Sequence, residues 1–146
     1  MDVEYIQLNK IPNARLLDSI LELHKSIFGS SDNLVKQMES KPELLINVAI
    51  EGTKVIGYKI GYGVDKEKFY SWLGGVDQKY RNTGVASKLM GKQHQYLKEQ
   101  GFKTVQTKTM NKWRSMLILN IKTGFDIIGT YTNEKEEFKI ILEKIL

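Results

Sequence analysis

Hydrophobic and polar residues change their spacing several times along this chain, and each change predicts a new element of secondary structure. Residues 3–8 alternate in the manner of a short strand. Apolar side chains then recur at helical spacing over residues 13–28. Gly29 is the expected end of that helix, and a second, short helix is expected from a cap at Asp32 through Met38.

β-branched and aromatic residues dominate the middle of the chain and are typical of strands. Short polar turns separate three such stretches at residues 44–51, 54–63 and 69–76, which predicts an antiparallel meander. Helical spacing returns over residues 84–100, with Gly101 as the expected end.

The last third of the chain alternates between the two patterns again. We expect a strand over residues 104–109, a helix over 113–123 that Gly124 ends, and two strands over 125–131 and 137–142. The predicted order is β-α-α-β-β-β-α-β-α-β-β, which places the fold in the α/β or α+β class.

Composition narrows the chemistry. The 146 residues contain no internal repeat or linker, so a single domain over residues 1–146 is expected. Cysteine is absent, which excludes disulfides and a cysteine nucleophile, and two distant histidines predict no metal site. The N-terminus lacks a signal pattern and no apolar run reaches the roughly 18 residues of a membrane span. We therefore expect a cytoplasmic protein without a membrane partner.

The net charge of +5 is concentrated in one segment. Residues 79–124 contain ten Lys or Arg against a single acidic residue, Glu99. This excess indicates an anionic ligand, although a solvated helix face would give the same count. A nucleic-acid-binding domain is the remote alternative, but no recognition-helix or base-stacking motif is present, so we expect no nucleic acid partner.

The basic segment opens on Arg81-Asn82-Thr83-Gly84-Val85-Ala86, which has the form R-x-x-G-x-A. Gly84 lets the backbone approach a ligand closely, and Arg81 adds a charge-assisted contact. Free amides at the start of the following helix suit a phosphate group. The hexapeptide alone is weak evidence for a phosphate site, because glycine is common at helix starts. Its position after a strand and before an amphipathic helix strengthens that evidence.

The loop and the order of elements together resemble the GNAT superfamily of acyl-CoA-dependent N-acetyltransferases over nearly the whole chain. Arg81 and Gly84 match the loop after the fourth strand, Ala86 replaces its second glycine, and Gly124-Phe125 matches a later segment. The resemblance implies a GNAT-like, mostly antiparallel central sheet flanked by helices, with acetyl-CoA as co-substrate. It also implies that the diphosphate lies on the amides of Asn82, Thr83, Gly84, Val85 and Ala86.

Gly74 and Gly75 interrupt the interior of a strand, which predicts a bulge or the close approach of a ligand. The resemblance implies that the pantetheine arm pairs with residues 74–76, where Val76 contributes its backbone. A freed N–H could polarise the thioester carbonyl. The alternative is a bulge that serves only the curvature of the sheet.

The resemblance also implies direct attack of a neutral amine on the thioester in a ternary complex, so one proton must leave the amine and another must reach the thiolate. The family's usual tyrosine acid is Asn120 here, whose amide can hydrogen-bond but cannot deliver a proton. We assign Asn120 and Asn111 to CoA contact. The alternatives are a polar helix face for Asn120 and a turn at the strand end for Asn111. A non-catalytic acyl-CoA-binding or sensor protein is the second functional reading.

Tyr70 stands where histone-type members have their glutamate base. With an ordinary pKa near ~10 it is a poor base, but it could act as an acid or orient a water. Trp72 is expected on the same face as Tyr70, as a wall of the acceptor cleft. The alternative for both is a core aromatic.

The acceptor is expected to be a small-molecule or peptide amine that meets the first two helices. Titratable residues there are His24, Glu22 and Asp32. His24 is alternatively a satisfied, partly buried histidine, and Asp32 a helix cap. Edge strands near the C-terminus make a homodimer a reasonable expectation.

Overall fold

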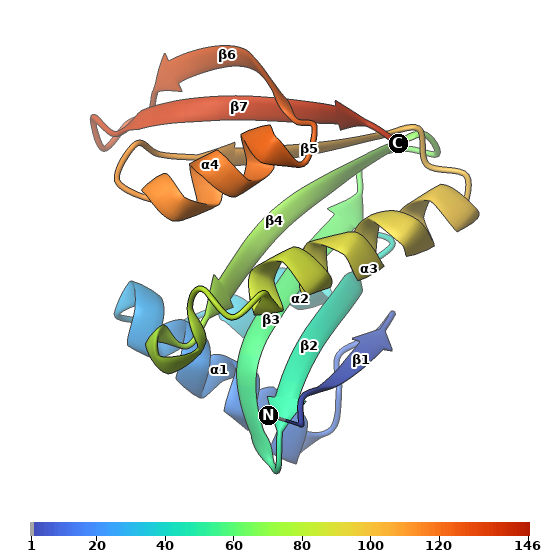
Figure 1. Ribbon diagram of the computed structural model, residues 1–146, viewed down its shortest axis with the longest axis vertical. Helices are drawn as coiled ribbons and strands as arrows, with labels where there is room; N and C mark the ends of the chain where they lie inside the picture. Colours follow the sequence, from blue (N-terminus) through green and yellow to red (C-terminus); the bar gives the residue numbers. More distant parts are fainter. Residues whose placement is uncertain (1) are drawn as a thin grey trace.

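The structure, a computed structural model, describes residues 2–146. Its seven strands form one sheet in the order β1-β2-β3-β4-β5-β7-β6, and β4 and β5 are its parallel pair (Figure 1). The elements along the chain are β1 (Glu4–Leu8), α1 (Ala14–Phe28), α2 (Leu34–Glu39), β2 (Leu45–Glu51), β3 (Lys54–Gly63), β4 (Lys68–Val76), a 3₁₀ turn (Gln78–Tyr80), α3 (Val85–Glu99), β5 (Thr104–Thr109), α4 (Arg114–Lys122), β6 (Asp126–Thr132) and β7 (Phe138–Ile145).

The predicted order of helices and strands is confirmed. Gly29, after α1, has φ 87°, a left-handed conformation that glycine adopts without strain. The predicted cap of the second helix is wrong, because Asn33, not Asp32, precedes α2 and makes no side-chain cap. The backbone N–H of Asp32 instead donates to Ser30 Oγ at 3.1 Å.

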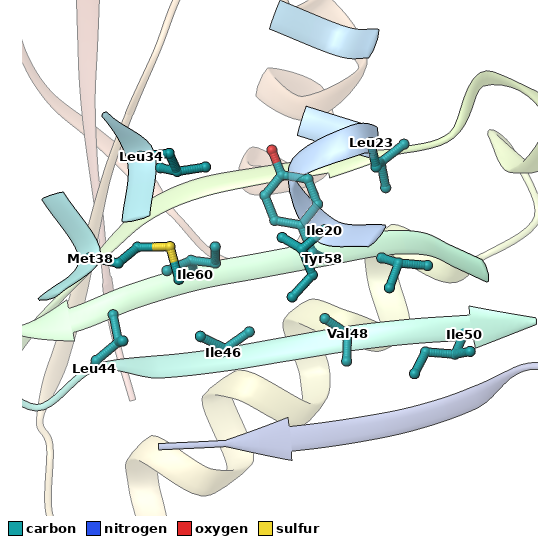
Figure 2. Packing of buried hydrophobic residues seen from close by; sticks show 11 residues of the cluster. Ile20, Leu23, Leu34, Met38, Leu44, Ile46, Val48, Ile50, Tyr58 and Ile60 are labelled. Carbon is teal, nitrogen blue, oxygen red and sulfur yellow. The ribbon is translucent and has the colours of Figure 1, made fainter. Parts of the chain in front are cut away.

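Two helices cover each face of the sheet (Figure 1). On one face, α1 and α2 pack on β2 and β3, and Figure 2 shows aliphatic side chains from all four elements filling this layer, with Tyr58 projecting from β3 toward α1. On the other face, α3 packs on β2 and β3 through Val85 and Leu89, while Met90 and Leu97 join α4 and β7. Burial of these faces is the main stabilising contribution to the fold.

Strands β4 and β5 separate partway along their length. They pair from Lys68 with Thr104 to Ser71 with Thr107, whereas β4 continues to Val76 with β3 alone beside it. Figure 1 shows β4 diverging from β5 toward α1. The edge of β4 from residue 72 to 76 therefore faces an opening in the sheet and has no strand to satisfy its backbone groups.

A bulge does interrupt β4, but at Trp72, two residues before the position that the glycine pair predicted. Ile60 pairs with Leu73 and Gly61 with Ser71, so Trp72 is the extra residue, while Gly74 and Gly75 pair regularly with β3. Next to the bulge, a Cβ at Gly61 of β3 would be 2.6 Å from Tyr70 O, so this position of β3 admits only glycine.

Candidate functional site

The loop between β4 and α3 leaves a helix N-terminus uncapped. Gly84 precedes α3 at φ 89°, no side chain caps the helix, and its first turn contains no acidic residue. Its first intrahelical bond joins Lys88 N to Gly84 O at 3.0 Å, so the preceding amides have no helical acceptor. Arg81 Nε lies 3.4 Å from Val76 O, which fixes the guanidinium stem at the same end of the helix. Free amides and a guanidinium at a helix N-terminus are groups that suit an anion.

The side chain of Thr83 bonds back to the loop itself and does not occupy the space beside the N-terminus of α3. Thr83 Oγ1 donates to Tyr80 O, and Asn82 takes a left-handed φ of 63°. No atom lies within 4 Å of a Cβ built on Gly84. The space beside Gly84 is therefore open.

The two glycines of β4 face opposite sides of the sheet. A Cβ on Gly75 would meet Ile27 Cδ1 of α1 at 2.5 Å, so packing against α1 favours glycine there. A Cβ on Gly74 would find its nearest neighbour, Tyr58 O, at 3.4 Å, and Lys59 at 3.7 Å, which are ordinary contacts. Packing among the described residues thus accounts for Gly75 and leaves Gly74 unexplained.

Tyr70 and Trp72 share one face, as alternation predicted, because the bulge separates them without reversing their direction. Both rings contact Tyr62, with centroids 5.6 and 6.0 Å away. Lys41 Nζ lies 4.8 Å from the ring centres of both Tyr62 and Trp72, and Lys108 Nζ lies over Tyr70 and Tyr131 at 5.8 and 5.1 Å. We call this the aromatic cluster; its members are Lys41, Tyr62, Tyr70, Trp72, Lys108 and Tyr131.

Within this cluster the Tyr70 hydroxyl stays protonated. Burial raises its pKa to about 12, and neighbouring Tyr62 and Tyr131 act in the same direction. A neutral tyrosine can donate a hydrogen bond, but it cannot accept a proton as a base. The sequence did not reveal the rest of the cluster, although Tyr62 could have been found from the meander, since it pairs directly with Tyr70.

His24 and Asp32 occupy different environments. His24 is buried on α1 with Nδ1 2.5 Å from Tyr58 Oη, and its ring contacts Phe28 at 4.8 Å. Burial lowers the pKa of His24, so the imidazole is neutral at pH 7. Asp32 is exposed in the connection between α1 and α2. Their predicted contact with the acceptor stays a prediction.

The two asparagines also differ. Asn120 lies on α4 and is 2% exposed, so it does not belong to a solvated helix face. Asn111 is exposed in the turn between β5 and α4. Phe28 of α1 and Trp113, next to α4, meet with ring centroids 5.5 Å apart, which brings the ends of these helices together. The contact with CoA predicted for both asparagines stays a prediction.

Over residues 2–146, no group of three or more His, Cys, Asp or Glu side chains could hold a metal ion. None of the helices in that range combines the length and apolar character needed to cross a membrane.

A sequence model of the acetyltransferase (GNAT) family matches residues 15–114. Among solved structures, Ard1 from Thermoplasma volcanium has a TM-score of 0.82 at 16% identity, with 97% of each chain covered. A GNAT family acetyltransferase from Elizabethkingia anophelis with acetyl-CoA bound has a TM-score of 0.78 at 20% identity, covering 99% of this chain and 98% of the other. The ribosomal-protein-S18-alanine N-acetyltransferase from Escherichia coli has a TM-score of 0.82 at 14% identity, covering 99% of this chain and 94% of the other. No curated protein sequence matches the chain significantly.

Proposed function

The chain belongs to the GNAT acetyltransferase family, and from that premise we propose that it transfers the acetyl group of acetyl-CoA to a primary amine. The proposal rests on two neighbouring stretches of backbone that lack hydrogen-bond partners from strands or helices. The open edge of β4 ends at Val76, and the uncapped amides of α3 begin a few residues later, beyond Arg81. One surface suits an extended amide-containing arm and the other suits its diphosphate.

The chain's own groups would divide the binding work as follows. Amides of residues 82–86 and the Arg81 guanidinium hold the diphosphate, while residues 74–76 pair with the pantetheine arm as a further strand would. Asn111 and Asn120 are the side chains that we assign to the same arm. The backbone N–H of Gly74 is the group that we assign to the thioester oxygen, where it would stabilise developing negative charge.

Transfer requires a neutral amine and direct attack on the thioester carbonyl while both substrates are bound. Tyr70 remains neutral, so its role is to donate a hydrogen bond or orient a water, not to remove a proton. Asn120, in the position of the usual tyrosine, can position the sulfur but has no acidic proton to give. Deprotonation of the amine is therefore assigned to water.

The acceptor is a small-molecule or peptide amine that enters along the aromatic cluster. Solved relatives named for aminoglycoside 6'-N-acetylation and for ribosomal-protein-S18-alanine N-acetylation represent both kinds of acceptor. A homodimer is part of the proposal, since the edge strand β6 exposes apolar side chains at Ile127 and Ile128.

Release of free thiol from acetyl-CoA tests the proposal directly. The assay uses an amine panel of amino acids, polyamines, aminoglycosides and N-terminal peptides, with calorimetry of CoA in parallel. We expect CoA binding and thiol release that depends on one class of amine. Binding without release across the panel would favour the non-catalytic reading, and absence of CoA binding would reject both.

A further inference from the structure

A row of polar residues crosses the sheet on the face that α3 covers. Gln7 pairs with Asn47, Asn47 with Lys59, and Lys59 with Gly74, so the row runs from the edge strand β1 to the open edge of β4. Asn47 Nδ2 donates to Gln7 Oε1 at 2.9 Å. Asn47 and Lys59 are both buried, at 2% and 8% exposed. Burying polar side chains costs free energy unless they are hydrogen-bonded or paired.

Lys59 is the charged member of this polar row. Its side chain lies over Gly74, with Cγ 3.7 Å and Nζ 3.8 Å from the position that a Cβ there would occupy. It takes part in none of the three salt bridges among residues 2–146. Burial lowers the pKa of Lys59 to about 8, so its ammonium loses a proton far more readily than that of a surface lysine.

The four buried side-chain atoms without a hydrogen-bond partner in residues 2–146 belong to residues of β2 and of α3, which covers the face of the sheet that bears Lys59. They are Asn47 Oδ1, both amide atoms of Gln93, and His94 Nε2. Gln93 and His94 come from α3, and Asn47 pairs directly with Lys59. Buried polar atoms without a protein partner indicate a layer that suits water or a polar ligand.

This layer reaches solvent at its far end. A groove between β1 and α3 is lined by Gln7, Asn47, Leu89 and Lys92, so it contacts the first two members of the polar row. The opposite end of the row is Gly74, on the edge of β4 that faces the opening in the sheet. The polar row thus connects a surface groove beside β1 with the open edge of β4.

We propose that Lys59 donates the proton that the departing CoA thiolate needs, in place of the tyrosine whose position Asn120 occupies. This role rests on the proposed function. When the amine nitrogen bonds to the acetyl carbon, the carbon–sulfur bond breaks and its electron pair stays on sulfur. Lys59 transfers one proton to that sulfur and becomes neutral; the acetylated nitrogen loses its extra proton to water, and Lys59 regains one from solvent after the products leave.

The absence of a side chain at Gly74 lets the Lys59 ammonium reach the sulfur. Any side chain at this position would stand between Lys59 and the open edge of β4, and packing among protein atoms does not require glycine there. The missing side chain therefore leaves a direct path over the strand. This gives Gly74 a role that the packing of Gly75 against Ile27 does not share.

The other charged groups near Lys59 do not compete for the role. From α3, His94 is neutral because burial, with Lys144 and Lys59, lowers its pKa to about 3. Its Nδ1 lies 3.3 Å from Lys144 Nζ of β7; since an ammonium only donates, the ring proton is on Nε2. From β2 and β4 the neighbours are Asn47 and Gly74, which do not titrate.

Lys59→Met and Lys59→Arg test the proposal, with Lys98→Met on the exposed face of α3 as the control. We expect kcat to fall about 100-fold in both Lys59 variants, because neither side chain can give up a proton at neutral pH, with amine KM and CoA affinity nearly unchanged. Wild-type kcat should decline above a pKa of about 8 as Lys59 loses its proton, and the variants should lose this alkaline limb.

Titration of bound CoA provides a second readout that needs no turnover. Ultraviolet absorbance of the thiolate should show a lower thiol pKa on the wild-type protein than on Lys59→Met, because the ammonium stabilises the anion. Wild-type kcat in Lys59→Met, or an unchanged thiol pKa on that variant, would overturn the proposal. Failure of CoA to bind the wild-type protein would instead reject the proposed function. If Lys59→Met does not fold, Lys59→Arg decides: wild-type kcat in that variant overturns the role.

Discussion

The two sides of β4 present different chemical groups, backbone on one and side chains on the other. One side presents backbone: the open edge of residues 72–76, which faces away from β3, and the amides before α3, shaped by Gly84 at φ 89°. The side toward α1 and α2 presents side chains of the aromatic cluster, which come from β3, β4, β5, β6 and the segment after α2.

This difference predicts how each side responds to change. A site made of amides keeps its geometry when most neighbouring side chains are exchanged, but it fails where one residue must take a left-handed backbone conformation. A site made of side chains depends on every ring and ammonium that lines it, and each contributes a modest amount. We therefore expect donor binding to depend on few positions and acceptor handling to depend on many.

The largest expected effect is the loss of CoA binding in Gly84→Glu. A glutamate there strains the backbone at φ 89° and places a carboxylate where the diphosphate is proposed to bind. Because like charges repel and the amides lose their alignment, we expect CoA affinity to fall about 100-fold or more by calorimetry.

Gly101→Glu is the matched control for that prediction. Gly101 follows the other end of α3 at φ 94°, and no atom lies within 4 Å of a Cβ built on it. The backbone strain is therefore similar, at about 1–2 kcal/mol, while the charge is placed at the wrong end of the helix for a diphosphate. Equal losses of affinity in both variants would show that helix strain, and not the amide site, explains the result.

A smaller effect is expected from Tyr70→Phe on the other side of β4. Removing the hydroxyl deletes one hydrogen-bond donor and keeps the ring, so kcat should fall about tenfold. CoA affinity should not change. Because the pKa of Tyr70 is about 12, the pH profile of kcat below pH 10 should keep its shape. Steady-state kinetics beside Tyr96→Phe, a tyrosine of α3, checks this; wild-type kcat in Tyr70→Phe removes the hydroxyl from the mechanism.

The two sides also differ in what the sequence could predict. Arg81 to Ala86 is contiguous, and its backbone geometry depends on one glycine and a helix start, so this geometry could be predicted from the sequence alone. The aromatic cluster needed strand pairing that joins Tyr62 to Tyr70 and tertiary packing that brings Lys41 to both Tyr62 and Trp72. No local pattern contains that information, because it arises only when the sheet forms.

The same limit applies to the polar row beneath α3. Lys59 alternates with apolar neighbours and would be taken from sequence for a solvent-facing strand residue, yet α3 covers that face. The bulge is a second case: the glycine pair of β4 suggested one at residues 74–75, but the register shift lies at Trp72, opposite Ile60 and Gly61 of β3. Both cases depend on which element packs opposite, which a single segment of sequence does not specify.

The smallest effect is expected from Gly75→Ala. This variant tests whether the β4 edge binds CoA through its backbone alone. In Gly75→Ala the new methyl meets the terminal methyl of Ile27, which can move, so we expect a loss of about 1 kcal/mol in unfolding free energy. The double variant with Ile27→Val removes that methyl, and a double-mutant cycle in urea should show the two changes to be coupled. CoA affinity should remain near wild type in Gly75→Ala, because the pairing that we propose uses only main-chain groups of residues 74–76. A large loss of affinity in this stable variant would mean that the space beside Gly75, rather than the strand edge, receives the arm.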